Sequence, residues 1–139
     1  MAQTPEGKVK ALAKGLYNKY RAKCDRATQN GMGKNGRADD IVRRAPDGHF
    51  IGVEIKKEGV FKVTKLQKIW LEDNAVGGGS SLVINLTNLK LLDATLASPG
   101  SRVVAKFEDC KGGALCLGHT VYHNGQQQWI PTTKENKDV

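Results

Sequence analysis

The chain has 139 residues, of which 39% are apolar, and this size and composition suit one globular domain with a buried core. Lys and Arg outnumber Asp and Glu by 22 to 14, and the net charge of +8 favours a polyanionic partner, nucleic acid before an anionic membrane. Three cysteines argue against a disulfide framework, and no apolar run approaches the roughly 18 residues of a transmembrane helix or the core of a signal peptide. We therefore expect a cytoplasmic protein without a membrane partner.

The first half of the chain predicts a helix and then a β-hairpin. Thr4 followed by Pro5 is typical of a helix start, and apolar residues at helical spacing carry the helix to an end near Lys23. Residues 30–36 form a glycine-rich loop, and a short strand before it is left open. Residues 39–45 and 49–57 are predicted strands, because Asp-Gly between apolar runs is typical of a hairpin turn.

The second half predicts a further helix, a buried strand, another helix and two more strands. Thr64 caps a helix over 64–76, which the glycines at 77–79 end. A strand over 81–85 and a helix over 86–96 follow, and strands over 102–108 and 114–122 come after the break at 99–100. The last ten residues are polar and should fray. The order predicts one mixed α/β domain, with a core over 4–97 and a C-terminal β extension over 101–130.

Chemistry is concentrated at Glu54 and Lys56, which should share one face of a strand because side chains alternate along it. An acid from the preceding strand, at Asp39 or Asp40, can complete the group. Carboxylates hold a hard divalent cation, which polarises a phosphate and activates water, and a lysine stabilises developing negative charge. This combination points to metal-assisted hydrolysis of a phosphodiester.

Hairpin geometry favours Asp39 over Asp40. If Asp47 and Gly48 form a two-residue turn, Asp39 lies opposite Lys56 and diagonal to Glu54. Asp40 then lies opposite Ile55, on the other face. A one-residue change in the turn would reverse this assignment.

Five elements follow one another along the chain. They are residues 4–9 at a helix start, 35–39 before a strand, 52–56 on the next strand, Thr64-x-x-Gln67 opening a helix, and the glycines at 77–79. In this order they resemble the PD-(D/E)XK nuclease superfamily, and specifically the stand-alone VRR-NUC type of phages and bacteria. The resemblance covers roughly residues 4 to 97.

The resemblance implies a restriction-endonuclease-like core, with a mixed central β-sheet flanked by helices, and cleavage of DNA with Mg²⁺ or, in its place, Mn²⁺. It implies that Asp39, Glu54 and the carbonyl of Ile55 hold the metal and that Lys56 is the catalytic lysine. Glu6 and Gln67 match residues that lie at the site. The family usually has Pro where Ala38 stands and an apolar or varied residue where Asp40 stands, so the motif does not decide between the two aspartates.

By the same resemblance, the expected substrate is branched DNA such as a Holliday junction. Two symmetric cuts would require a homodimer, and the setting would be a bacterial or phage-infected host cell. A nicking, duplex or flap DNA endonuclease, a non-catalytic nucleic-acid binder and a ribonuclease remain alternatives. Structural alternatives also remain: Glu54 and Lys56 as a surface ion pair, Glu6 as a first-turn acid, and Gln67 as a solvated helix residue. A zinc site at Cys110, Cys116, His119 and His123 is a further alternative.

Overall fold

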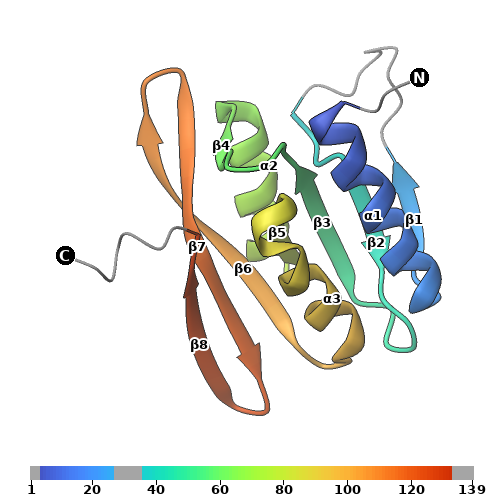
Figure 1. Cartoon of the computed structure of the whole chain (residues 1–139). Coiled ribbons are helices and arrows are strands. Elements are labelled where there is room, and N and C mark those ends of the chain that lie inside the picture. The colour runs from blue at the N-terminus through green and yellow to red at the C-terminus, as the bar shows by residue number, and fades with distance from the viewer. Residues whose placement is uncertain (1–3, 27–35, 133–139) are drawn as a thin grey trace.

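The computed structural model describes residues 4–26 and 36–132 (Figure 1). Within these residues eight strands form one mixed sheet in the order β1-β2-β3-β5-β6-β7-β4, with β8 paired to β7. This confirms the α/β class and the mixed sheet. In chain order the elements are α1 (Pro5–Lys19), β1 (Lys23–Arg26), β2 (Asp40–Arg43), β3 (Phe50–Ile55), β4 (Lys62–Val63), α2 (Lys65–Val76), β5 (Ser80–Ile84), the 3₁₀ turn η1 (Leu86–Asn88), α3 (Leu89–Ala97), β6 (Arg102–Cys110), β7 (Gly113–His123) and β8 (Gln126–Pro131).

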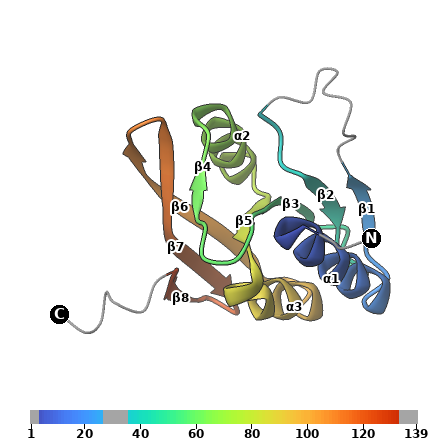
Figure 2. The ribbon, with the colours of Figure 1, turned by 45° about the horizontal axis from the view of Figure 1, so that its top comes forward.

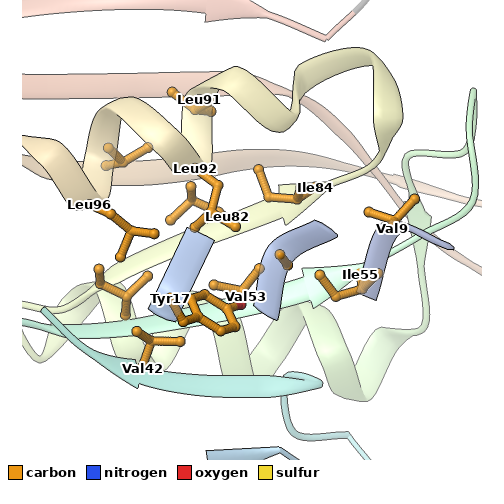
Figure 3. Close-up of a cluster of buried hydrophobic side chains, with 13 residues drawn as sticks. Val9, Tyr17, Val42, Val53, Ile55, Leu82, Ile84, Leu91, Leu92 and Leu96 are labelled. Carbon is orange, nitrogen blue, oxygen red and sulfur yellow. The ribbon is translucent and has the colours of Figure 1, made fainter. Parts of the chain in front are cut away.

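Helices cover both faces of the sheet, with α1 and α3 together on one side and α2 on the other (Figure 2). Alternation along β3 and β5 divides their side chains between two cores. Val53 of β3 and Leu82 of β5 face α1 and α3, whereas Val83 faces α2. The larger core is shown in Figure 3 and includes Val9 and Tyr17 of α1 and Leu92 of α3. The two cores hold β3, which carries Glu54, in the middle of the molecule.

Both long helices begin where the sequence predicts. The Thr4 hydroxyl accepts a hydrogen bond from the Gly7 N–H at 2.9 Å, with Pro5 at the first helical position. Helix α2 begins with a complete capping box between Thr64 and Gln67. Helix α1 ends at Lys19, earlier than predicted, because the chain turns at Arg21 (φ 58°) and then enters β1. Strand β1 occupies the position left open before the glycine-rich loop, most of which lies outside the described residues.

The predicted hairpin register is wrong by two residues, although its assignment of faces survives. Asp40 pairs with Val53, and the next pairings lead to a four-residue turn over 45–48, closed by the Arg44 N–H bonding the His49 carbonyl at 2.9 Å. Asp39 is therefore not opposite Lys56, and Asp40 is not opposite Ile55. A shift by an even number of residues keeps every side chain on its face. Asp39 thus stays on the face of Glu54.

The strands after residue 101 continue the same sheet. Strand β6 runs parallel to β5, β7 pairs antiparallel with β6, and the two residues of β4 pair with the far end of β7. The sequence predicts neither β4 nor β8. Residues 130–132, where fraying was expected, are ordered against β7, and the Thr132 hydroxyl donates to the Cys116 carbonyl at 2.9 Å. The rest of the predicted frayed tail lies outside the described residues.

None of the helices in the described ranges is long and apolar enough to cross a membrane.

Candidate active site

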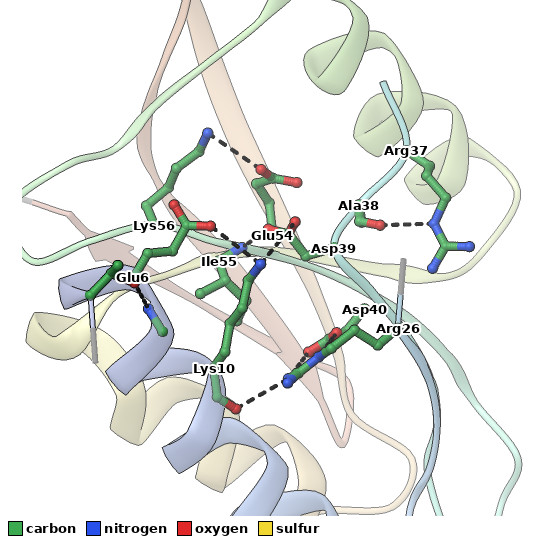
Figure 4. Close-up of polar contacts among 12 residues, drawn as sticks. Glu6, Lys10, Arg26, Arg37, Ala38, Asp39, Asp40, Glu54, Ile55 and Lys56 are labelled. Atoms are coloured by element: carbon green, nitrogen blue, oxygen red, sulfur yellow. Dashed lines mark hydrogen bonds and ion pairs between the residues drawn. The ribbon is translucent and has the colours of Figure 1, made fainter. Parts of the chain in front are cut away.

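Asp39 and Glu54 form a carboxylate pair where β3 ends and the chain enters β2. Glu54 is buried, with 2% of its side chain exposed, and Asp39 is mostly buried. Oδ2 of Asp39 accepts a hydrogen bond from the Ile55 N–H at 2.7 Å, which holds the aspartate at the end of the hairpin ladder. Figure 4 shows the two carboxylates together, with side chains from α1 and β3 around them. The structure thus brings the two predicted acids to one place.

The environment of the pair disfavours two negative charges. Burial, together with the neighbouring Asp39, raises the pKa of Glu54 to about 8. Burial also raises the pKa of Asp39, against the lowering effect of its bond to the Ile55 N–H. In the described part of the chain, Oε1 of Glu54 is buried without a hydrogen-bond partner. Such an orphaned oxygen costs free energy unless something binds it.

A hard divalent cation fits this donor set. Two carboxylates offer oxygen ligands, and the unpartnered Oε1 of Glu54 is free to serve as one. The N–H and C=O of one strand residue point to the same side, so the Ile55 carbonyl faces Asp39 as the Ile55 N–H does. No group of three or more His, Cys, Asp or Glu side chains in residues 4–26 and 36–132 could hold a metal ion. The Ile55 carbonyl would therefore supplement the two carboxylates.

Lys56 approaches Glu54 from the end of β3. Its Nζ lies 3.3 Å from Oε2 of Glu54 and 3.4 Å from Oε1 of Gln67. Its main-chain N–H donates to the Ile84 carbonyl at 2.9 Å, which fixes the residue to β5. With 18% of its side chain exposed, Lys56 is held against Glu54 but is not sealed from solvent. This placement differs from that of a freely solvated surface lysine.

Gln67 connects the start of α2 to the site. Its Nε2 donates to Oε2 of Glu54 at 2.8 Å, while its Oε1 accepts from the Thr64 N–H at 2.9 Å. One side chain therefore caps the helix and orients the buried carboxylate. The structure places Gln67 inside the site rather than on a solvated face of α2.

Glu6 lies at the edge of the site and pairs with a residue that the sequence analysis missed. Its Oε2 is 3.4 Å from the Nζ of Lys10, one helical turn later, and 45% of the Glu6 side chain is exposed. Lys10 Nζ also lies 4.0 Å from Oδ1 of Asp39 (Figure 4). Glu6 is thus connected to the carboxylate pair through Lys10. The four-residue spacing from Glu6 was the available signal for Lys10.

Asp40 has a separate, structural set of partners. Its fully buried carboxylate accepts from Nε of Arg26 at 2.7 Å, from the second Arg26 nitrogen at 2.9 Å and from the Tyr17 hydroxyl at 2.8 Å. Both oxygens are engaged on the face away from Glu54. Arg26 also donates to the main-chain carbonyl of Lys10 at 3.1 Å, so the pair fixes α1 to the hairpin. Asp39, rather than Asp40, is the aspartate presented to the site.

The alternative zinc site does not assemble. His119 is buried and its Nε2 accepts from the Val83 N–H at 3.1 Å, while burial lowers the pKa of this imidazole to about 4. Cys116 is buried in the core beside α2, whereas Cys110 is exposed near the end of the hairpin. These residues therefore serve packing and strand pairing.

Comparisons of this chain with protein-family models, with curated proteins and with solved structures found no match.

Proposed function

We propose that this protein is a metal-dependent DNA endonuclease with a restriction-endonuclease-like core, of the PD-(D/E)XK superfamily and its VRR-NUC type. One observation carries the proposal. A buried carboxylate pair, with one oxygen unpartnered in the described structure, lies against a lysine held by two neighbours. A surface ion pair would need neither the burial nor the second carboxylate. Metal-assisted phosphodiester hydrolysis uses both.

In this proposal Asp39, Glu54 and the Ile55 carbonyl hold Mg²⁺, for which Mn²⁺ substitutes. The bound ion would polarise the scissile phosphate and lower the pKa of a water molecule. Lys56 orients the attacking water and stabilises the negative charge that develops on the phosphate. Gln67 keeps Oε2 of Glu54 in place, so that Oε1 remains available. The products would carry a 5′-phosphate and a 3′-hydroxyl, as the family resemblance implies.

The net positive charge supports recognition of DNA by its shape. The net charge of +8 favours contacts to phosphates, which are independent of base sequence. We therefore propose branched DNA, and a four-way junction first, as the substrate. Paired cuts in such a junction would come from a homodimer.

The test is cleavage of a labelled four-way junction and of the matching linear duplex, with Mg²⁺, with Mn²⁺ or with EDTA. Lys56→Ala is the inactivating variant, and Lys57→Ala is its matched control because Lys57 is the exposed neighbour. Paired symmetric nicks in the junction alone, lost with EDTA and in Lys56→Ala but kept in Lys57→Ala, would support the proposal.

Other outcomes separate the alternatives. Equal cutting of the linear duplex would retain a nuclease and reject junction selectivity. Cutting of an RNA strand run in parallel, with DNA left intact, would indicate a ribonuclease. Binding of DNA without cutting under any metal condition would contradict catalysis and favour a non-catalytic binder.

A further inference from the structure

Two ammonium groups reach the carboxylates of the site from different elements. Lys56, at the end of β3, pairs with Glu54. Lys10, on α1, lies between Glu6 and Asp39, at 3.4 Å from one and 4.0 Å from the other. The proposed catalytic chemistry uses Lys56. The position of Lys10 is unexplained by it.

The Lys10 contacts differ from those of an ordinary helix-surface ion pair. A pair four residues apart on a helix contributes little and needs no third partner. Here the ammonium also faces a carboxylate from another part of the chain, and only 18% of the Lys10 side chain is exposed. The Lys10 carbonyl accepts from Arg26 at 3.1 Å, so Arg26, paired with the buried Asp40, fixes this turn of α1. The cation is therefore built into the site.

A position between two carboxylates is where a second divalent ion would bind. In two-metal sites the ions lie about 3.5–4 Å apart, and hard cations of this kind take carboxylate oxygens as ligands. Asp39 is the one carboxylate here that faces both Glu54 and, across Lys10, Glu6. The Lys10 ammonium thus lies between Asp39 and Glu6.

We propose that the site takes a single divalent ion, held at Asp39 and Glu54, and that the Lys10 ammonium takes the place of a second ion between Asp39 and Glu6. This inference rests on the proposed function. With the ion bound and Glu54 ionised, three carboxylates and two ammoniums leave one negative charge in excess, which a single divalent ion already offsets. A second ion would have to displace Lys10 from both of its partners. The built-in cation therefore limits the metal count.

The experiment counts Mn²⁺ ions bound per full-length chain, without DNA, by calorimetric titration and by the electron paramagnetic resonance signal of free Mn²⁺. Lys10→Met keeps the aliphatic side chain and removes the charge. Lys10→Arg keeps a cation, and Lys14→Met removes a charge from the exposed position one turn later. We expect one ion for the wild type, Lys10→Arg and Lys14→Met, two for Lys10→Met, and one again for Lys10→Met combined with Glu6→Gln.

Two ions in the wild type would overturn the inference regardless of how any variant folds. One ion in a folded Lys10→Met protein, checked by circular dichroism, would overturn it as well. No bound ion in the wild type would instead overturn the proposed metal-dependent function, and this inference with it. A protein without a metal site would thus bind no ion, whereas a wrong role for Lys10 would give two ions in the wild type or one in Lys10→Met.

Discussion

Arg26 donates two hydrogen bonds to the Asp40 carboxylate, at 2.7 and 2.9 Å. Asp40 therefore has structural partners, whereas its neighbour Asp39 does not share them. The pair lies on the core face of the hairpin, where the Tyr17 hydroxyl adds a third bond to the same carboxylate. Asp39, on the opposite face, is left to meet Glu54. Asp40 stabilises the packing of α1 and β1 on the hairpin, and Asp39 lies in the candidate site.

Replacing each aspartate by asparagine should therefore have opposite effects. We expect Asp40→Asn to lower the free energy of unfolding by about 2 kcal/mol. The buried carboxylate accepts three hydrogen bonds that an amide cannot all accept, whereas the Arg26 cation left behind is partly exposed and solvated. Asp39→Asn should leave stability unchanged or raise it, since burial already disfavours this charge, and should abolish Mn²⁺ binding. Urea denaturation measures the free energy of unfolding of each variant, and calorimetric titration measures its Mn²⁺ binding. Loss of Mn²⁺ binding in a stable Asp40→Asn protein would reverse the assignment.

Glu54 should make the metal-free protein less stable as the pH rises. Its pKa is raised from an ordinary 4.5 to about 8, so between these values the folded state holds a proton that the unfolded state releases. The stabilisation is complete below about pH 4.5 and is lost as the pH rises through 8. We expect the unfolding free energy in EDTA to fall by at least about 1 kcal/mol from pH 5.5 to 8.5 because of this group.

The measurement is urea denaturation of the wild type and Glu54→Gln across this range. Glu54→Gln should lack this contribution, and saturating Mn²⁺ should remove it from the wild type by displacing the proton and holding the carboxylate in its ionised form. Glu108→Gln, at an exposed position on β6, is the matched control. Identical pH profiles for the wild type and Glu54→Gln would show that the buried carboxylate is not protonated as inferred.

Gln67 should affect activity well beyond its effect on stability. Gln67→Ala removes the capping contact and also releases Oε2 of Glu54, so we expect a loss of about 1 kcal/mol in stability and of 10- to 100-fold in metal affinity or cleavage. Thr64→Ala removes the other half of the capping box and leaves the Glu54 contact. It should match the stability loss with a much smaller loss of metal affinity. Equal losses of metal affinity in Gln67→Ala and Thr64→Ala would show that Gln67 acts only by capping α2 and does not orient Glu54.

His119 should make the protein sensitive to acid. Its pKa is lowered from an ordinary 6.5 to about 4, so as the pH falls between these values the unfolded chain takes up a proton that the folded chain refuses. We expect this group to cost about 2 kcal/mol of stability between pH 7 and pH 5. His119→Gln retains an acceptor for the Val83 N–H and does not titrate. As the pH falls from 7 to 5, the urea midpoint of the wild type should therefore decrease relative to that of His119→Gln.

Local signals gave most of the fold. Caps at Thr4 and Thr64 set the helix starts, and alternation along 52–56 set the faces of β3. The turn after Arg44 is two residues longer than the Asp-Gly signal indicates, which moved the register but preserved the faces. The two residues of β4 are too few to show any period, and β8 is a mostly exposed edge strand without apolar alternation.

The sequence predicts those site residues whose positions follow from a single strand or helix cap. Glu54 and Lys56 share a strand, and Gln67 follows from the capping box. The partnership of Lys10 with Asp39 and of Arg26 with Asp40 joins α1 and β1 to the hairpin. Such contacts between distant segments depend on how helices dock on the sheet, and no spacing along the chain encodes them.

The segment of chain between Lys56 and Gln67 contains β4, which pairs with β7 at the far end of the sheet. After β3 the chain crosses to β7, where Val63 pairs with Ala114, and returns at once into α2. A side chain at Gly113 would collide with the Val63 carbonyl, so the crossing is tightly packed. A protein shortened after α3 would keep Asp39, Glu54 and Gln67 but lose β7, the strand that anchors the segment between β3 and α2. A shortened protein that keeps the carboxylate pair, Lys56 and Gln67 in place would therefore have to extend through Thr132, well beyond residues 4–97.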